Sequence, residues 1–202
     1  KFYNKPSNFI SNSTVVITVG TPVDDFLNPD MGQIKDCIDT LIPYLKKKQL
    51  IILRSTVYPG TSSWLYKYLL KKKKCDIAFC HERVIQGYTF DEIEKIPQII
   101  AANSKKAEKR ATDIFSKISK KIVYSSLKEA EFSKLFSNAF RYTQFAVANE
   151  FYMLADKAGL DFNKIRKITK DGYPRAESMP SAGFAAGPCL LKDTMQLLSF
   201  SR

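Results

Sequence analysis

Short apolar runs alternate with stretches of helical periodicity along the first 125 residues of the chain. Residues 14–19 and 49–53 are continuous aliphatic or β-branched runs, which predict strands buried on both faces of a parallel sheet. Residues 30–48 instead carry apolar side chains three and four apart, which predicts a helix between these strands. The positions that set this helical period are Ile34, Ile38, Leu41, Ile42 and Leu45.

The same alternation continues as far as residue 125. Strands are predicted at residues 76–79, 96–102 and 121–124, and helices at residues 63–70 and 105–118. Thr61 or Ser62 is the expected N-cap of the helix at 63–70. Strands that alternate with helices at this spacing form βαβ units, so we expect an α/β fold with a mostly parallel sheet.

The pattern changes after residue 125. Residues 127–158 contain no Gly or Pro and keep a helical period, which predicts one long helix ended by Gly159 as its C′ residue. Asp161 is expected to cap a short helix at 162–170. The stretch 171–193 has no period, and another helix is expected from Asp193 to the end of the chain.

These patterns predict two regions. Residues 1–125 are expected to form the C-terminal part of a Rossmann-like domain, and residues 126–202 a long connecting helix with the start of an all-α domain. Such a sheet normally opens with a Gly-x-Gly-x-x-Gly turn, which this sequence lacks. We therefore expect the 202 residues to be an internal piece of a larger enzyme.

The net charge of +12 raises the question of a nucleic-acid or membrane partner. Many lysines, however, follow helical stretches, where cations meet the negative end of the helix dipole. Arginine–aromatic interleaving of the single-strand-binding kind is absent from the sequence. Neither a secretory signal nor an apolar run of membrane-spanning length is visible. We expect neither partner.

Cysteine and histidine usage restricts the chemistry further. The four cysteines are scattered without zinc-site spacing, and there is a single histidine, so no metal site is expected. Free thiols without a signal sequence predict a cytoplasmic location. Cys75 and Cys80 flank a predicted strand and are expected to pack in the core.

Candidate chemistry begins at the ends of the predicted strands. Polar turns follow the first three strands: Gly20-Thr21-Pro22, then residues 54–61, and then Cys80-His81-Glu82. The carboxyl ends of strands form the edge at which open α/β sheets bind ligands. Ordinary turns are the alternative explanation for each motif taken alone.

A loop of small residues at 183–193 places a single thiol, Cys189, beside Lys192 and Asp193. Small residues let backbone amides approach a ligand, and positive surroundings favour a thiolate. The loop alone is equally compatible with a buried, inert cysteine.

Taken together, these motifs resemble the UDP-glucose/GDP-mannose dehydrogenase family in order and spacing from residue 15 to residue 198. A Lys-x-x-x-Asn helix followed by Gly-Pro-Cys-x-x-Lys-Asp is the specific part of the likeness. The motifs that carry it are Gly20-Thr21-Pro22, Ser55-Thr56-Val57-Tyr58-Pro59-Gly60-Thr61, Glu82-Arg83-Val84 with Gly87, Glu129-Ala130-Glu131 with Lys134 and Asn138, Ala148-Asn149-Glu150, and Gly187-Pro188-Cys189-Leu190-Leu191-Lys192-Asp193.

The resemblance implies a four-electron oxidation, in which the C6 alcohol of a nucleotide sugar becomes a carboxylate and two NAD⁺ are reduced. It implies a homodimer formed through the long helix, and a C-terminal nucleotide-sugar domain outside these residues. The isolated 202 residues are accordingly expected to be inactive. A UDP-sugar is the favoured substrate class, with UDP-glucose, UDP-N-acetyl sugars and GDP-mannose left open.

The resemblance also implies roles for single residues. Cys189 would be the nucleophile that captures the aldehyde as a thiohemiacetal and then a thioester. Lys134 and Asn138 lie four apart on one helix face and would stabilise charge on the C6 oxygen. Their apolar neighbours Leu135, Phe136, Ala139 and Phe140 predict a largely covered helix. A solvated helix face is the alternative.

Further roles follow from the same likeness. Asp193 would orient or deprotonate groups near the thiol, or cap the last helix, or do both. Glu82 and Thr56 would hold the catalytic water and border the nicotinamide. The remaining matches are cofactor positions at Thr21, Lys192 and Gln86, and substrate positions at Arg175 and Gly187, besides Glu82, Lys134 and Asn138.

The sequence departs from the family pattern in places. His81 stands where many relatives have proline, Gln86 where some have a second glutamate, and Ala185 and Ala186 replace common glycines. Two alternatives stay open: a two-electron β-hydroxyacid-type dehydrogenase, which needs no thiol, and a non-catalytic basic binding module. The behaviour of Cys189 discriminates among the three.

Overall fold

The computed structural model describes residues 13–84, 87–185 and 189–201, and the chain divides into two compact units. Unit 1 comprises residues 1–135 and 195–202, and unit 2 comprises residues 136–194. Helices α5 (Leu127–Lys157) and α7 (Cys189–Phe200) each contribute residues to both units.

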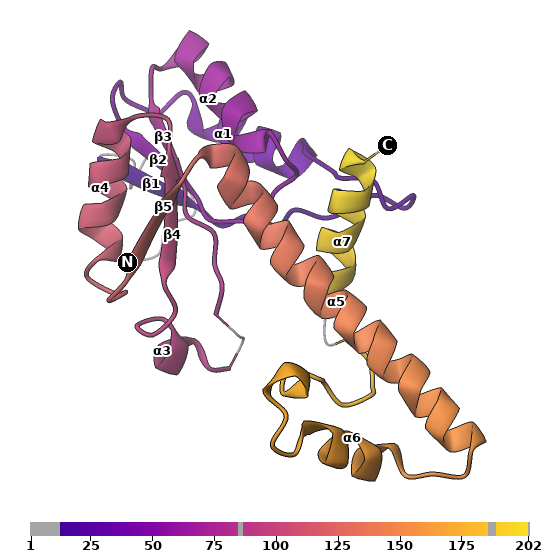
Figure 1. Cartoon of the computed structure of the whole chain (residues 1–202). Helices are drawn as coiled ribbons and strands as arrows, with labels where there is room; N and C mark the ends of the chain where they lie inside the picture. The colour runs from indigo at the N-terminus through magenta and orange to yellow at the C-terminus, as the bar shows by residue number, and fades with distance from the viewer. Residues whose placement is uncertain (1–12, 85–86, 186–188, 202) are drawn as a thin grey trace. The chain divides into compact units, whose positions relative to one another are not determined.

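Unit 1 is built on a five-stranded sheet in the order β1-β2-β3-β4-β5 (Figure 1). The first three strands are parallel, β4 runs antiparallel to β3, and β5 is parallel to β4. The expected α/β fold with a partial Rossmann-type sheet and a long central helix is confirmed. The strands are β1 (Thr14–Ile17), β2 (Leu50–Leu53), β3 (Asp76–Phe79), β4 (Gln98–Ala102) and β5 (Ile122–Ser125).

The reversal at β4 was not expected from the sequence. The connection from β3 to β4 holds only the single-turn helix α3 (Thr89–Glu92) among its described residues. A parallel crossover is usually made by a helix long enough to cover one face of the sheet. The chain instead returns antiparallel, with Phe79 paired to Ala101. This register brings the start of β4 beside the turn that follows β3, where Gln98 Nε2 donates to His81 O.

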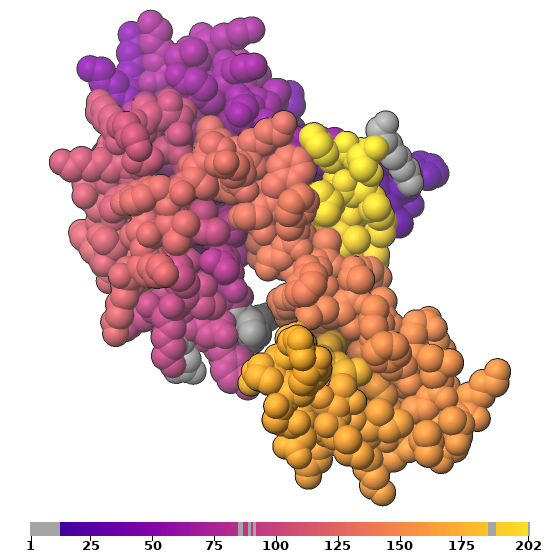
Figure 2. All heavy atoms as spheres, viewed as in Figure 1, coloured from indigo at the N-terminus to yellow at the C-terminus, as the bar shows by residue number. Residues whose placement is uncertain are grey.

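Side chains of the sheet alternate between two apolar cores. Ile51 and Leu53 point to the face covered by α1 (Gly32–Leu41) and α2 (Thr61–Lys72). Leu50 and Ile52 point to the face covered by α4 (Lys105–Phe115). The period-two alternation of these buried strands explains their continuous apolar sequence. On the side of unit 1 seen in the space-filling view, atoms of α4 and β5 lie at the surface (Figure 2).

Three expectations for unit 1 are corrected. β1 is not buried on both faces, because Val16 is 47% exposed. The helix predicted at 30–48 ends at Leu41, because Pro43 lacks the amide hydrogen that would continue the helical hydrogen bonds beyond Ile42. Neither Thr61 nor Ser62 caps α2: both lie inside the helix, and the N-cap is Gly60 at φ 95°.

Unit 2 confirms the expected helix ends. α5 stops in a Schellman motif: Leu160 N donates to Ala155 O and Gly159 N to Asp156 O, with Gly159 at φ 69°. Asp161 caps α6 (Phe162–Lys170) by accepting from the amides of Asn163 and Lys164. The 3₁₀ helix η2 (Pro174–Ala176) follows.

Two expectations for unit 2 are corrected. α5 is not a largely covered helix, because Phe136 is 56% and Phe140 65% exposed. α7 begins at Cys189 rather than at Asp193, so Asp193 lies one turn inside the helix and is not its N-cap. Leu190, in the first turn of α7, is buried.

Candidate functional site

The turns after β1 and β2 are joined by side-chain hydroxyls in unit 1. Thr21 Oγ1 donates to Thr56 O at 2.5 Å, and Ser55 Oγ donates to Val19 O at 2.5 Å. Two of the expected cofactor positions, Thr21 and Thr56, are thus brought together at the carboxyl edge of the sheet. Open α/β sheets bind ligands at this edge.

A buried amide from α7 reaches the same turn. Gln196 is 1% exposed, and its Nε2 donates to Thr21 O at 3.4 Å. Within the described part of the chain, Gln196 Oε1 is buried without a hydrogen-bond partner. Because buried polar atoms are almost always satisfied, an acceptor left open beside Thr21 fits a site that receives a polar ligand such as NAD.

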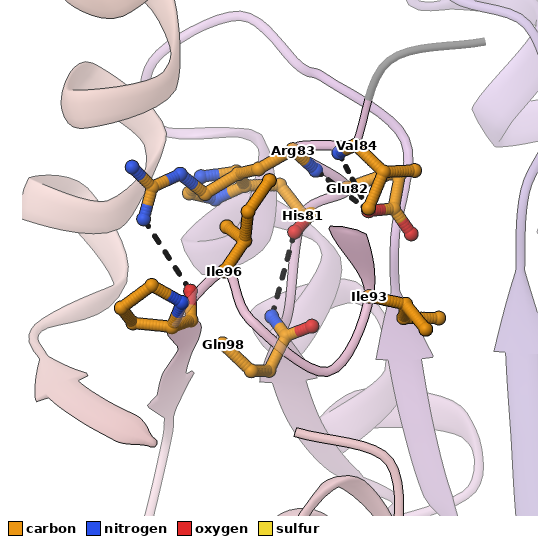
Figure 3. A pocket seen from close by; sticks show the side chains of 8 residues that line it. His81, Glu82, Arg83, Val84, Ile93, Ile96 and Gln98 are labelled. Atoms are coloured by element: carbon orange, nitrogen blue, oxygen red, sulfur yellow. Dashed lines mark hydrogen bonds between the residues drawn. The ribbon is translucent and has the colours of Figure 1, made fainter. Parts of the chain in front are cut away.

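Glu82 lies just beyond the carboxyl end of β3, at the rim of a small pocket (Figure 3). Its Oε1 accepts from the amides of Arg83 (2.7 Å) and Val84 (3.0 Å), and its Oε2 pairs with the Arg54 guanidinium. Burial acts to raise the pKa of Glu82. The Val84 amide, the charge of Arg54 and the Arg83 amide outweigh burial and lower that pKa below its usual value. The carboxylate is therefore held ionised.

His81 is buried beside Glu82, with 1% of its surface exposed. Its ring tilts against Phe79, and Nδ1 has no hydrogen-bond partner among the described residues. Burial lowers the pKa of His81 to about 3, with further lowering from the charges of Lys134, Arg83 and Arg54. At neutral pH this imidazole is uncharged.

Lys134 and Glu131 lie on the first half of α5, in unit 1. Lys134 is half-buried, and its charge acts on His81. Glu131 is 1% exposed and accepts from the amides of Gly60 and Ser62, both at 2.7 Å. It thereby satisfies amides at the start of α2, which have no partners within that helix.

The predicted nucleophile lies in unit 2, at the start of α7. Cys189 is exposed, and Asp193 follows one turn later with 1% exposure. Asn138 Nδ2 donates to Asp193 Oδ2 at 2.5 Å, and Lys192 Nζ lies 2.7 Å from Asp193 Oδ1. Four of the predicted site residues are therefore gathered in this unit: Asn138, Cys189, Lys192 and Asp193.

The remaining predicted residues are placed as follows. Lys134 lies one turn before Asn138 on α5, so the two project from neighbouring turns of the same helix face. Arg175 lies in η2, exposed, with its guanidinium 4.7 Å from the centre of the Tyr173 ring. Gln86 and Gly187 lie outside the described residues.

The other cysteines differ from Cys189 in their surroundings. Cys75 and Cys80 are buried, as expected, and Cys37 is partly buried. Burial raises the pKa of all three thiols, that of Cys80 to about 12. Since the thiolate is the reactive form, burial lowers the reactivity of these three cysteines, and Cys189 is the exposed thiol among the four.

Two kinds of feature are absent from the described residues. None of the described helices combines the length and the apolar character that crossing a bilayer requires. The described residues also hold no cluster of three His, Cys, Asp or Glu side chains suited to a metal ion.

Three residues were given no role in the site from the sequence: Arg54, Glu131, which is part of a motif that carries the family resemblance, and Gln196. Arg54 directly follows an all-apolar strand, and a charge at the carboxyl end of such a strand could have indicated a role in the site. Glu131 shares a helix face with Leu135 and Asn138, so its burial could have been suspected. Gln196 lies seven residues after Cys189, on the same face of α7, but its contact with Thr21 has no local signal.

Comparison with known proteins gives two matches to one family. Residues 2–119 match the NAD binding domain of the UDP-glucose/GDP-mannose dehydrogenase family, and residues 128–202 match its central domain. The expected cofactor, NAD, is confirmed at the level of this domain.

Individual relatives agree with the domain matches. The chain is 30% identical to a UDP-N-acetyl-D-mannosamine dehydrogenase of Methanocaldococcus jannaschii, over 93% of this chain and 44% of the relative. It is 27% identical to an NDP-N-acetyl-D-galactosaminuronic acid dehydrogenase of Ralstonia nicotianae, over 88% of this chain and 45% of that protein. The chain spans about half the length of the relatives it matches.

A solved structure extends the likeness to three dimensions. A UDP-D-ManNAc dehydrogenase from Pyrococcus horikoshii superimposes with a TM-score of 0.91 at 27% identity, covering 99% of this chain and 49% of that one. A UDP-glucose dehydrogenase from Pyrobaculum islandicum, at 22% identity and a TM-score of 0.87, shares the fold. The chain belongs to the UDP-glucose/GDP-mannose dehydrogenase family.

Proposed function

We propose that this chain carries the cofactor edge and the nucleophile of an NAD-dependent nucleotide-sugar 6-dehydrogenase. Residues 1–125 would supply the later part of the NAD-binding domain. Residues 126–202 would supply the connecting helix and the start of the central domain. The family-model boundaries, 2–119 and 128–202, support this division.

One observation carries the proposal: an exposed thiol begins a helix that presents a buried carboxylate one turn later. Cys189 and Asp193 are four apart in α7, which places them on one face. Asp193 is fixed by Asn138 and Lys192. A nucleophile beside an acid that other side chains orient is the arrangement that covalent catalysis uses.

The proposed chemistry proceeds in two oxidations. The C6 alcohol loses a hydride and a proton to give an aldehyde, and Cys189 Sγ adds to its carbon to give a thiohemiacetal. Loss of a second hydride and proton leaves a thioester on Cys189. Water then adds to the thioester carbonyl, and the thiol departs as the carboxylate forms. Capture by the thiol keeps the aldehyde from escaping between the two oxidations.

The side chains would serve these steps as follows. Asn138 would donate a hydrogen bond to the C6 oxygen, and Lys134 would offset its negative charge in the alkoxide and the tetrahedral intermediate. Asp193 would accept a proton from the thiol or from water. Glu82, held ionised, would orient the hydrolytic water together with Thr56. Arg175 and Gly187 would contact the substrate.

Thr21, Thr56, Lys192 and Gln86 would hold the cofactor. NAD⁺, when bound, accepts the hydride in each oxidation. The open acceptor on Gln196 beside Thr21 supports a polar ligand at this edge of the sheet.

We propose a UDP-N-acetylhexosamine as the substrate. The support comes from relatives named UDP-N-acetyl-D-mannosamine dehydrogenase in Methanocaldococcus jannaschii, Pyrococcus horikoshii and Escherichia coli. UDP-glucose and GDP-mannose serve as comparison substrates in the assay below.

We further propose that α5 forms a homodimer contact. Exposed apolar side chains recur along one side of the helix in unit 2, within about 60° of one another at 100° per residue. They are Phe136, Phe140, Val147, Phe151 and Leu154. An apolar stripe of this kind marks a protein interaction surface. Replacing Phe140 and Phe151 by Glu should convert the dimer to a monomer in analytical ultracentrifugation.

The central test is the product formed by the full-length protein and its Cys189→Ser variant. With UDP-N-acetyl-D-mannosamine and excess NAD⁺, the parent should release two NADH per uronic acid. The variant should form no acid, and any NADH it produces should stop at the aldehyde. Full turnover to acid by the variant, or a ratio of one NADH per product in the parent, would support the two-electron alternative instead.

Thiol labelling separates the enzyme from a non-catalytic basic module. Iodoacetamide should modify Cys189 faster than the three buried or partly buried cysteines, and UDP-sugar should protect it. Equal labelling of all four cysteines, unaffected by UDP-sugar, would contradict the proposal. Cys37→Ser is the matched control, because this partly buried thiol packs against the apolar core of unit 1 and has no proposed role in the chemistry.

A further inference from the structure

Arg54 is held rigidly just after the carboxyl end of β2. Its Nη1 donates to Cys80 O at 2.8 Å and to Gln98 Oε1 at 3.0 Å. The guanidinium carbon lies 4.9 Å from the centre of the Phe115 ring, and 13% of the side chain is exposed. Because the planar guanidinium of Arg54 bonds two acceptors and packs on one aromatic ring, its orientation is fixed.

The other arm of that fork points to Glu82. Arg54 Nη2 pairs with Glu82 Oε2, while Glu82 Oε1 takes the amides of Arg83 and Val84. Both carboxylate oxygens are therefore occupied on their inner sides. The side chain is still 40% exposed, so a ligand or water can reach it from outside.

Gln98 fixes the backbone that leads into Glu82. Its Nε2 donates to Ile99 O at 2.7 Å and to His81 O at 3.4 Å (Figure 3). Its Oε1 is the atom that accepts from Arg54. Arg54 and Gln98 together hold the carbonyls of Cys80 and His81 and the carboxylate of Glu82, three consecutive residues.

We propose that Arg54 is a positioning residue that fixes Glu82 for thioester hydrolysis, with Gln98 as its support. The inference rests on the function proposed above, in which Glu82 orients the hydrolytic water. Arg54 does not touch the reacting atoms itself. It sets where the carboxylate points, and it keeps a partly buried carboxylate ionised.

The charges around Glu82 support this assignment. Arg54 pairs with the carboxylate, Arg83 follows it in the chain, and His81 is neutral because it is buried. Lys134, on α5, acts on His81 from the same unit. Burial alone acts to raise the pKa of Glu82, so removing the guanidinium should let that pKa rise.

The experiment compares Arg54→Met, Arg54→Lys and a matched control, Arg110→Met. Like Arg54, Arg110 has two oxygen acceptors and a carboxylate partner: it donates to the backbone carbonyls of Lys48 and Ser13 and lies 3.6 Å from the carboxylate of Asp76. It does so at the amino ends of β1 to β3, away from Glu82. Arg110→Met therefore reports the cost of losing a sheet-anchoring arginine without disturbing the site.

The first readout is the titration of Glu82, followed by carboxyl ¹³C NMR in the 202-residue chain and assigned with Glu82→Gln. The pKa of Glu82 should lie below its usual value in the parent and in Arg110→Met, and should rise in Arg54→Met. This readout requires neither substrate nor turnover. An unchanged titration in Arg54→Met would overturn the inference.

The second readout is the pH profile of uronic acid formation by the full-length protein. Arg54→Met should lower kcat between about tenfold and about a hundredfold, as a misplaced catalytic group does. The acid limb of the pH–rate profile should move to higher pH, and the KM for NAD⁺ should stay unchanged. Compared with Arg54→Met, Arg54→Lys should recover part of kcat and move the acid limb of the profile part of the way back to lower pH. Equal profiles for Arg54→Met and Arg110→Met would overturn the inference. Full acid formation by Cys189→Ser would instead overturn the proposed function.

Discussion

Two buried acids, one in each unit, use their carboxylates in different ways. Glu131 in unit 1 and Asp193 in unit 2 both lie on helices and are both 1% exposed. Glu131 gives one oxygen to the amide of Gly60 and the other to that of Ser62. Asp193 instead contacts two side-chain nitrogens, Asn138 Nδ2 and Lys192 Nζ.

This difference in hydrogen-bond partners indicates which of the two carboxylates can take part in a reaction. An acid whose oxygens satisfy backbone amides is committed to the fold, because losing it leaves buried donors without partners. An acid held by a lysine and an asparagine can exchange those partners for substrate or water without unfolding a helix. Asp193 also has an exposed thiol one turn away, which Glu131 does not.

The largest expected effect is on turnover, from Asp193→Asn. This variant keeps the shape of the side chain and a hydrogen-bonding oxygen for Asn138, but it removes the charge that would accept a proton. Uronic acid formation should fall about 10²- to 10⁴-fold, the usual contribution of a general base. The midpoint of thermal unfolding should change little. The measurements are NADH production with a UDP-sugar and calorimetry on the same samples.

The comparison predicts the reverse pattern for Glu131→Ala. The buried amide of Ser62 and the partly buried amide of Gly60 would lose their acceptor, which should lower the free energy of unfolding by about 2–4 kcal/mol. Chemical denaturation of the 202-residue chain measures this change. Glu129→Ala is the matched control: this exposed side chain exchanges hydrogen bonds with Ser126 in a capping box, so its loss should cost much less. Equal losses in the two variants would show that Glu131 is not committed to the fold.

Local rules predicted the parts of the fold that depend on neighbouring residues. The stop of α5 at Gly159 and the cap of α6 at Asp161 follow from residues within five positions of those helix ends. The length of α5 follows from a stretch with a helical period and no Gly or Pro. The direction of β4 does not, because pairing with β3 is decided by the whole connection between them. The early end of α1 was readable from Pro43.

The candidate site likewise contains residues that local motifs predicted and contacts between distant segments that they did not. Cys189, Asp193 and Asn138 were predicted because their spacing forms a motif, and the structure joins Asn138 to Asp193 across 55 positions of sequence. The contacts of Arg54 with Cys80, Glu82 and Gln98 link three separate strand ends. No pattern in one stretch of sequence encodes such contacts. The start of α7 was missed because residues 183–193 contain small residues and a proline, which weaken any helical signal.

His81 supplies a pH test of how firmly unit 1 is packed. Its pKa is about 3 in the folded chain and near 6.5 when exposed, so the unfolded state takes up a proton that the folded state refuses. The contribution of neutral, buried His81 to the free energy of unfolding is fully present above pH 6.5. It is lost as the pH falls from 6.5 towards 3. The free energy of unfolding should fall by about 2 kcal/mol between pH 6.5 and pH 5. This pH range lies above the usual pKa values of the carboxylates.

Denaturant unfolding between pH 5 and pH 7 measures this loss, and His81→Phe should flatten the curve. The chain has a single histidine, so its ring signals can be followed by NMR without ambiguity. A His81 that titrates near 6.5 in the folded chain would contradict the burial on which the prediction rests.

The smallest expected effect compares one glycine from each unit. Gly159 has φ 69° in unit 2 and Gly60 has φ 95° in unit 1, and an added Cβ would meet no atom within 4 Å at either position. Alanine at each site should therefore cost only the backbone strain of the left-handed region, about 1 kcal/mol. Hydrogen exchange distinguishes the two variants: Gly159→Ala should speed exchange in residues 136–194, and Gly60→Ala should speed it around α2. If both variants sped exchange equally along the whole chain, the two units would unfold as one, and the contrast between Glu131 and Asp193 could not be assigned to separate units.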